Sequence, residues 1–188
     1  TNSRSTSPEL ATALRALLPR LLDPREPAIL RRKALFACAE PGVLPEAILP
    51  QLITSLRDKD ETVRCAAAVA LWRATWSGTI PAMSLLAYVA DEDPHVRSAA
   101  VGAISATAPA CFPQVQASLV EMLSDERRWV RIEALLAVRK FGRAAAKLAP
   151  QIRCAAGDAD PLIRALAVEA LGRIGAGDEA TVSLLIRV

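Results

Sequence analysis

The segment Asp58-Lys-Asp60-Glu-Thr-Val63-Arg64-Cys-Ala-Ala67-Ala-Val-Ala70-Leu71 determines the architecture of this 188-residue chain, because it recurs along the sequence. It reappears as Asp158-Ala-Asp160-Pro-Leu-Ile163-Arg164-Ala-Leu-Ala167-Val-Glu-Ala170-Leu171. Its arginine returns at intervals of 33, 33, 34 and 33 residues, each time after an aliphatic residue and with alanines three and six positions later: Arg31, Arg64, Arg97, Arg131 and Arg164. Self-similarity at a fixed period of this length is the signature of a repeat protein.

Each repeat is predicted to be a pair of helices joined by a polar turn. In the second repeat the apolar residues follow the i, i+3, i+4 spacing of an amphipathic helix: Ile48, Leu49, Leu52, Ile53 and Leu56. We expect first helices at 45–56, 79–90, 113–123 and 145–156, and second helices at 61–76, 94–107, 128–141 and 161–174. A less regular opening pair is expected at 9–22 and 28–39, and a last helix is expected to begin near Asp178.

The turn before each second helix carries helix-capping residues. Asp60, Asp93 and Asp160 lie four residues before their arginines, where an aspartate can accept hydrogen bonds from the free N–H groups of the helix that follows. The fourth repeat has Arg127 at this position, so its helix is expected to be less well capped. A second aspartate stands two residues earlier in four of the turns: Asp58, Asp91, Asp125 and Asp158.

The composition favours helices packed through small aliphatic side chains. Apolar residues make up 52% of the chain and aromatic residues 4%, so the core must be built from Ala, Leu, Val and Ile. The 23 basic and 20 acidic residues are interspersed, unlike the concentrated basic surface of a dedicated nucleic-acid binder. No apolar run reaches the ~20 residues that span a bilayer. Four dispersed cysteines without a CxxC pair favour a reducing, cytoplasmic setting.

No catalytic or cofactor-binding constellation is visible in the sequence. The single histidine, His95, has no nucleophile motif around it and is expected to be a solvated surface residue. One histidine cannot complete a Cys/His zinc site, and no glycine-rich loop opens a helix after a strand. We therefore expect a non-enzymatic protein with no cofactor and no metal site.

The recurring Asp-x-Asp-x-x-Val-Arg-x-x-Ala-x-x-Ala-Leu pattern resembles the HEAT repeat, particularly the short form of phycobilisome-lyase-like proteins. The resemblance implies an all-α fold, a right-handed α-solenoid of about five antiparallel helix pairs plus a partial C-terminal helix. It also implies that this solenoid is a single domain over residues 1–188. The expected repeats are 9–40, 45–77, 79–108, 112–142 and 145–176, with a partial repeat at 178–188. It also implies that the recurrent arginines pair with turn aspartates as a structural ladder, for which the candidate residues are the five arginines with Asp60, Asp93 and Asp160. Because the chain stops inside an apolar run, we expect it to be part of a longer one.

A stripe along the second helices is the predicted partner-binding surface. Positions −2, +2, +5 and +9 from each arginine share one helical face, which is expected to be the concave one, and this face is unusually apolar in its middle. The candidate contacts are Phe36, Val69, Arg73, Trp129, Leu136, Lys140, Leu162 and Leu166. Exposed apolar surface with arginines is typical of an interaction site, so the expected occupant is a protein or peptide partner, or another part of the same parent chain.

Three alternatives remain open at this stage. The stripe could pack against neighbouring repeats if the curvature is tight. The repeat type also suggests a relative of phycobilin lyases that handles a bilin chromophore. The slight positive charge, together with Trp72, Trp76 and Trp129, suggests a HEAT-like DNA-binding or glycosylase protein. Interspersed acidic residues make nucleic acid the weaker of these hypotheses, and no membrane association is expected.

Overall fold

The computed structural model describes residues 8–38, 48–177 and 181, and this described part of the chain is all-helical, with no strand. Its fold is of the α-solenoid class, in which helix pairs stack on one another. The chain divides into two compact units, residues 1–84 and 85–188, and each is described by itself. The handedness of the solenoid and its organisation as one domain stay predictions.

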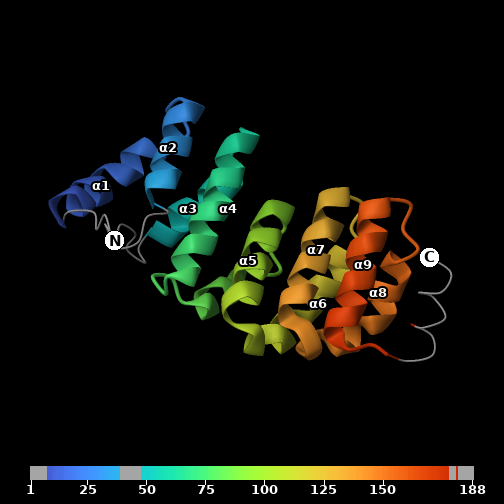
Figure 1. Ribbon diagram of the computed structural model, residues 1–188. Helices are drawn as coiled ribbons and strands as arrows, with labels where there is room; N and C mark the ends of the chain where they lie inside the picture. The colour runs from blue at the N-terminus through green and yellow to red at the C-terminus, as the bar shows by residue number, and fades with distance from the viewer. Residues whose placement is uncertain (1–7, 39–47, 178–180, 182–188) are drawn as a thin grey trace, which may run out of the picture. The chain divides into compact units, whose positions relative to one another are not determined.

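In its described residues, the first unit contains two helix pairs (Figure 1). Its helices are α1 (Pro8–Leu21), α2 (Ala28–Cys38), α3 (Leu49–Leu56) and α4 (Glu61–Trp76). Both α2 and α3 pack against α4. The contact is close because the residues that α4 buries are small or aliphatic: Val63, Ala66, Ala67, Ala70, Leu71 and Ala74. Leu35 of α2 and Leu52 of α3 are fully buried, so these helices share one core.

The second unit stacks its helices in two layers (Figure 1). One layer holds α5 (Pro94–Thr107), α7 (Arg128–Phe141) and α9 (Pro161–Ile174), and the other holds α6 (Phe112–Leu123) and α8 (Ala149–Ala155). Short 3-10 segments, η3 (Pro109–Cys111) and η4 (Gly142–Leu148), lead into α6 and α8. The inward face of α7 is buried at the positions that the repeat pattern predicts: Val130, Ala134, Ala137, Val138 and Phe141.

The four regular second helices have the bounds that the sequence predicts, 61–76, 94–107, 128–141 and 161–174. Asp60, Asp93 and Asp160 cap the starts of three of these helices, and Gly142 and Gly175 follow the ends of two. The opening pair lies within one residue of its predicted bounds wherever it is described. Residues 39–47 and most of the helix expected from Asp178 lie outside the described residues.

Two predicted first helices are wrong in type. The segment expected as an α-helix at 79–90 contains the 3-10 helix η2 (Ala82–Tyr88), within which the boundary between the units falls. The helix expected at 145–156 is 3-10 up to Leu148 and α-helical only from Ala149. Pro150 explains the second case, because it has no N–H for an interior α-helical bond and is tolerated only in the first turn.

Candidate functional site

The recurrent arginines bind the turns that precede their own helices. Arg64, Arg97, Arg131 and Arg164 each donate from Nη1 to the two backbone carbonyls six and five positions earlier, at N–O distances of 2.7–3.2 Å. Each guanidinium therefore fixes the turn between the two helices of its own repeat. Arg31 makes an equivalent contact, donating to the carbonyls of Pro24 and Glu26.

The other edge of the guanidinium reaches the turn of the following repeat. Arg31 donates from Nε and Nη2 to the two carboxylate oxygens of Asp58 at 2.8 and 2.7 Å. Arg131 binds Asp158 in the same way at 3.0 and 3.4 Å. Arg97 lies 3.5 Å from the Asp125 carboxylate. One arginine thus joins two consecutive turns, a role that its planar fork of donors suits better than a lysine ammonium would.

The two aspartates of each turn have separate roles. Asp60, Asp93 and Asp160 accept hydrogen bonds from backbone amides of the helices they cap, as expected, while Arg127 makes no side-chain cap bond. The earlier aspartate accepts the amide two residues on and, in three turns, the arginine of the preceding repeat: Asp58, Asp125 and Asp158. The sequence pattern contains these three residues, but the candidate ladder named only the capping set.

Two of the turn carboxylates, Asp58 and Asp160, have lowered pKa values. Burial acts to raise the pKa of Asp58, but hydrogen bonds from Arg31 and from the Asp60 amide, with the charge of Arg31, lower it below its usual value. A hydrogen bond from Arg128, with those from the first amides of α9, lowers the pKa of Asp160 to about 2. These arginines already hold carboxylates or backbone carbonyls, and their contacts account for the repeat of the motif.

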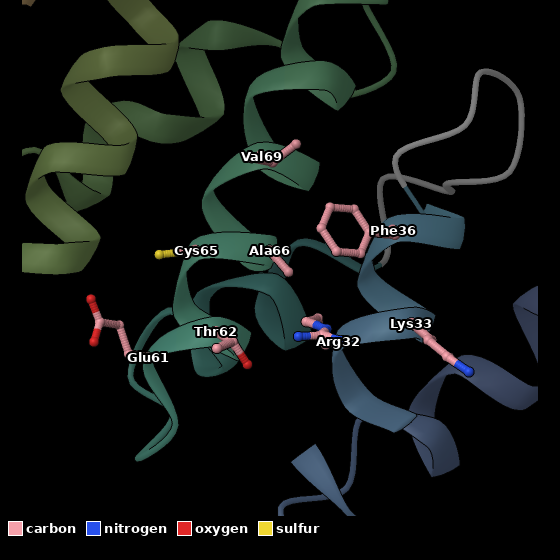
Figure 2. A pocket seen from close by; sticks show the side chains of 8 residues that line it. All are labelled: Arg32, Lys33, Phe36, Glu61, Thr62, Cys65, Ala66 and Val69. Atoms are coloured by element: carbon pink, nitrogen blue, oxygen red, sulfur yellow. The ribbon is translucent and has the colours of Figure 1, made fainter. Parts of the chain in front are cut away.

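A groove of about 450 Å³ lies in the first unit, between α2 and α4 (Figure 2). Its lining is Arg32, Lys33, Phe36, Glu61, Thr62, Cys65, Ala66 and Val69. The Phe36 ring of α2 points toward Ala66 and Val69 of α4, and Arg32 points toward Thr62 one turn below (Figure 2). The volume lies within the range of roughly 300–1,000 Å³ that is typical of binding pockets.

Two of the candidate contacts meet in this groove. Phe36 is 49% exposed and Val69 is 42% exposed, so the two side chains give the groove an exposed apolar surface. Arg73 is exposed on α4 but does not line the groove. The sequence-based stripe missed Trp72 and Trp76, which are both exposed on α4 and stack on each other with ring centroids 5.8 Å apart. They stand at +8 and +12 from Arg64, beside the four positions that defined the stripe.

The second unit carries the remaining candidate contacts, and there the stripe is partly covered. Trp129 of α7 is half-buried because His95 of α5 stacks on it, with ring centroids 4.4 Å apart and an interplanar angle of 11°. The expectation that His95 is a solvated surface residue is therefore wrong, because the indole of Trp129 shields it. Leu136 and Leu166 are half-buried, whereas Lys140 is exposed. Leu162 on α9, 45% exposed, is the open apolar contact of this set.

Within the described residues, no group of three or more His, Cys, Asp or Glu side chains is placed to hold a metal ion. Cys65, Cys111 and Cys154 are not joined in disulfide bonds. In the same part of the chain, no helix has the length and apolar character needed to cross a membrane.

Paired helices stacked through small residues, with one arginine bridging successive turns, define a helical-repeat protein of the α-solenoid class. The comparisons then identify the repeat. The family described as HEAT repeats matches residues 116–188, and the HEAT repeat family matches residues 48–73. The chain is a HEAT-repeat protein. A search of curated proteins found no match.

Proposed function

We propose that this protein is a non-enzymatic scaffold that binds a protein or peptide partner on the face formed by its second helices. HEAT repeats typically mediate protein interactions, and the family is generally non-enzymatic. A cytoplasmic location and the short phycobilisome-lyase-like form belong to the same proposal.

The groove between α2 and α4 carries this proposal. The ladder arginines have structural partners, so the repeat motif does not need a ligand to explain it. Phe36 and Val69, by contrast, expose apolar surface toward the groove, and their exposure is not required by the packing of α2 on α4. Exposed apolar residues of this size at the centre of a concave surface usually anchor a partner.

Neither alternative function has a specific observation in its favour. A DNA-binding face would need a concentration of basic residues, but the groove lining has two cations and one carboxylate. Of the three tryptophans that prompted that hypothesis, Trp129 is stacked on His95, and Trp72 and Trp76 are stacked on each other. The packing alternative applies to part of the stripe in the second unit, where Trp129, Leu136 and Leu166 are half-buried.

Charge substitutions on the open part of the stripe test the proposal. We expect Phe36→Asp and Val69→Asp to reduce co-purification of the native partner by at least about tenfold, because a charge would be buried at the contact. Helical circular dichroism and the melting temperature should change little, since both side chains are largely exposed. Leu17→Asp on α1 is the matched control, because Leu17 is 47% exposed and lies outside the groove.

Partner recovery that is the same for both stripe variants and the control would reject the second-helix face as the binding surface. Trp129→Glu and Leu136→Glu extend the test to the second unit. Since both side chains are half-buried, their melting temperatures must be compared before any loss of partner is attributed to contact.

A further inference from the structure

The α2–α4 groove has a polar end and an apolar end. Figure 2 shows the Arg32 side chain turned toward α4 beside Thr62, and the Phe36 ring one turn further along, facing Ala66 and Val69. Lys33 and Glu61 line the rim, and their charged ends point away from the groove. Arg32 and Thr62 therefore stand one helical turn before Phe36 and Ala66 on their own helices, and the Thr62 hydroxyl donates to Asp60.

Arg31 and Arg32 are neighbours in sequence with opposite environments. Arg31 is 3% exposed and holds the Asp58 carboxylate in a two-bond contact. Arg32 is half-buried, and the structure gives it no hydrogen bond or ion pair with any described residue. A guanidinium has five N–H donors and is always charged. Beside an open groove, the half-buried Arg32 can therefore donate hydrogen bonds to a carboxylate of a ligand.

We propose that this groove binds an acidic amphipathic helix of a protein partner. This inference rests on the proposed scaffold function and names the chemistry of its partner. The groove runs along α2 and α4, and its lining residues are spaced by single turns, a spacing that matches the i, i+4 and i+7 anchors of a docked helix. A Leu-sized side chain covers Phe36 and Val69, and a carboxylate one turn away pairs with Arg32.

Charge complementarity supports an acidic occupant over a basic one. Arg32 is the charged side chain of the lining that turns toward the groove, because the charged ends of Lys33 and Glu61 point away from it. A basic helix would place its charge against Arg32, whose guanidinium cannot lose its proton.

Three helix-stabilised synthetic peptides with a common apolar register test the proposal. They carry Glu, Gln or Lys four residues from a central Leu, and fluorescence anisotropy measures their affinity for the full chain. We expect the Glu peptide to bind at least about fivefold more tightly than the Gln peptide, and the Lys peptide to bind most weakly. Added salt should narrow the difference between the Glu and Gln peptides.

Variants of the chain separate the charge from the docking surface. Arg32→Gln should remove the preference for the Glu peptide and leave the affinity of the Gln peptide unchanged. Arg25→Gln is the matched control, because Arg25 is exposed and lies outside the groove. Phe36→Asp should weaken the binding of all three peptides.

Each contrary outcome has a distinct meaning. Equal affinity for the Glu and Gln peptides, or an unchanged preference in Arg32→Gln, would overturn the acidic partner while leaving the scaffold function in place. Failure of all three peptides to bind would also overturn the acidic partner. Displacement of the Glu peptide by duplex DNA, at a phosphate concentration equal to that of the peptide, would do the same. The scaffold function itself would be rejected only if Phe36→Asp and Val69→Asp recovered as much native partner as the Leu17→Asp control.

Discussion

Replacing Arg31 with methionine should destabilise the first unit strongly. The side chains of Arg31 and Asp58 are 3% and 8% exposed, and they share two short hydrogen bonds. Methionine preserves much of the aliphatic stem but leaves Asp58 as a buried carboxylate without its counter-charge. It also removes the donor to the carbonyls of Pro24 and Glu26.

The expected loss is about 3 kcal/mol in the free energy of unfolding. Removing one partner of a buried ion pair costs ~3–5 kcal/mol, and the lower end applies because Asp58 keeps its hydrogen bond from the Asp60 amide. A loss of this size lowers the ratio of folded to unfolded chain by roughly a hundredfold. The Arg31→Met, Asp58→Asn double variant should recover part of the loss, because it leaves no unpaired charge.

Tryptophan fluorescence can report the first unit separately. The chain has three tryptophans, of which Trp72 and Trp76 belong to α4 and Trp129 to α7. Urea unfolding in a Trp129→Phe background therefore follows the first unit alone. A loss below about 1 kcal/mol, or one no larger than that of the exposed control Arg25→Met, would refute the structural role of Arg31.

The remaining predictions concern pH and helix ends. The pKa of Asp58, the carboxylate paired with Arg31, is lowered in the folded chain. Its contribution to the free energy of unfolding is therefore present above the unfolded-state pKa of 3.8 and is lost as the pH falls through the folded-state pKa. The deficit of Arg31→Met in urea titrations should shrink toward pH 2 for this reason. An NMR titration should give Asp160 a pKa of about 2, and Arg128→Ala should move it back toward 3.8; an unchanged value would contradict the pairing. Gly175→Ala should lower the free energy of unfolding by about 1 kcal/mol, because Gly175 has φ = 75° at the end of α9. Gly172→Ala, within the helix and with open space for a Cβ, should raise it by roughly 0.5–1 kcal/mol; the same sign for both variants would contradict this account.

The second helices were predictable because their signals are local. Asp60 and Asp160 mark starts, Gly142 and Gly175 mark ends, and the small residues between them repeat at helical spacing. The first helices lack such signals. In the segment before α8, apolar periodicity extends through η4, and only Pro150 reveals that regular α-helix begins later.

The groove was predictable only in part. The stripe positions identified Phe36 and Val69, which are both exposed and line the same groove. Arg32 was missed because it stands one position after Arg31, outside the four positions that defined the stripe. A helix face is wider than one such column of residues, so Arg32 still reaches the groove. The stacking of His95 on Trp129 depends on the approach of two helices, which sequence spacing does not specify.

Site-specific photo-crosslinking in the native host tests the central claim most directly. A photoreactive p-benzoylphenylalanine is placed at Val69 in the groove or at Leu17 on α1, which have similar exposure. The scaffold account predicts a discrete crosslinked partner from the groove position and none from the control. Equal crosslinking at both positions, or crosslinking at the control position alone, would contradict the assignment of the second-helix face as the binding surface.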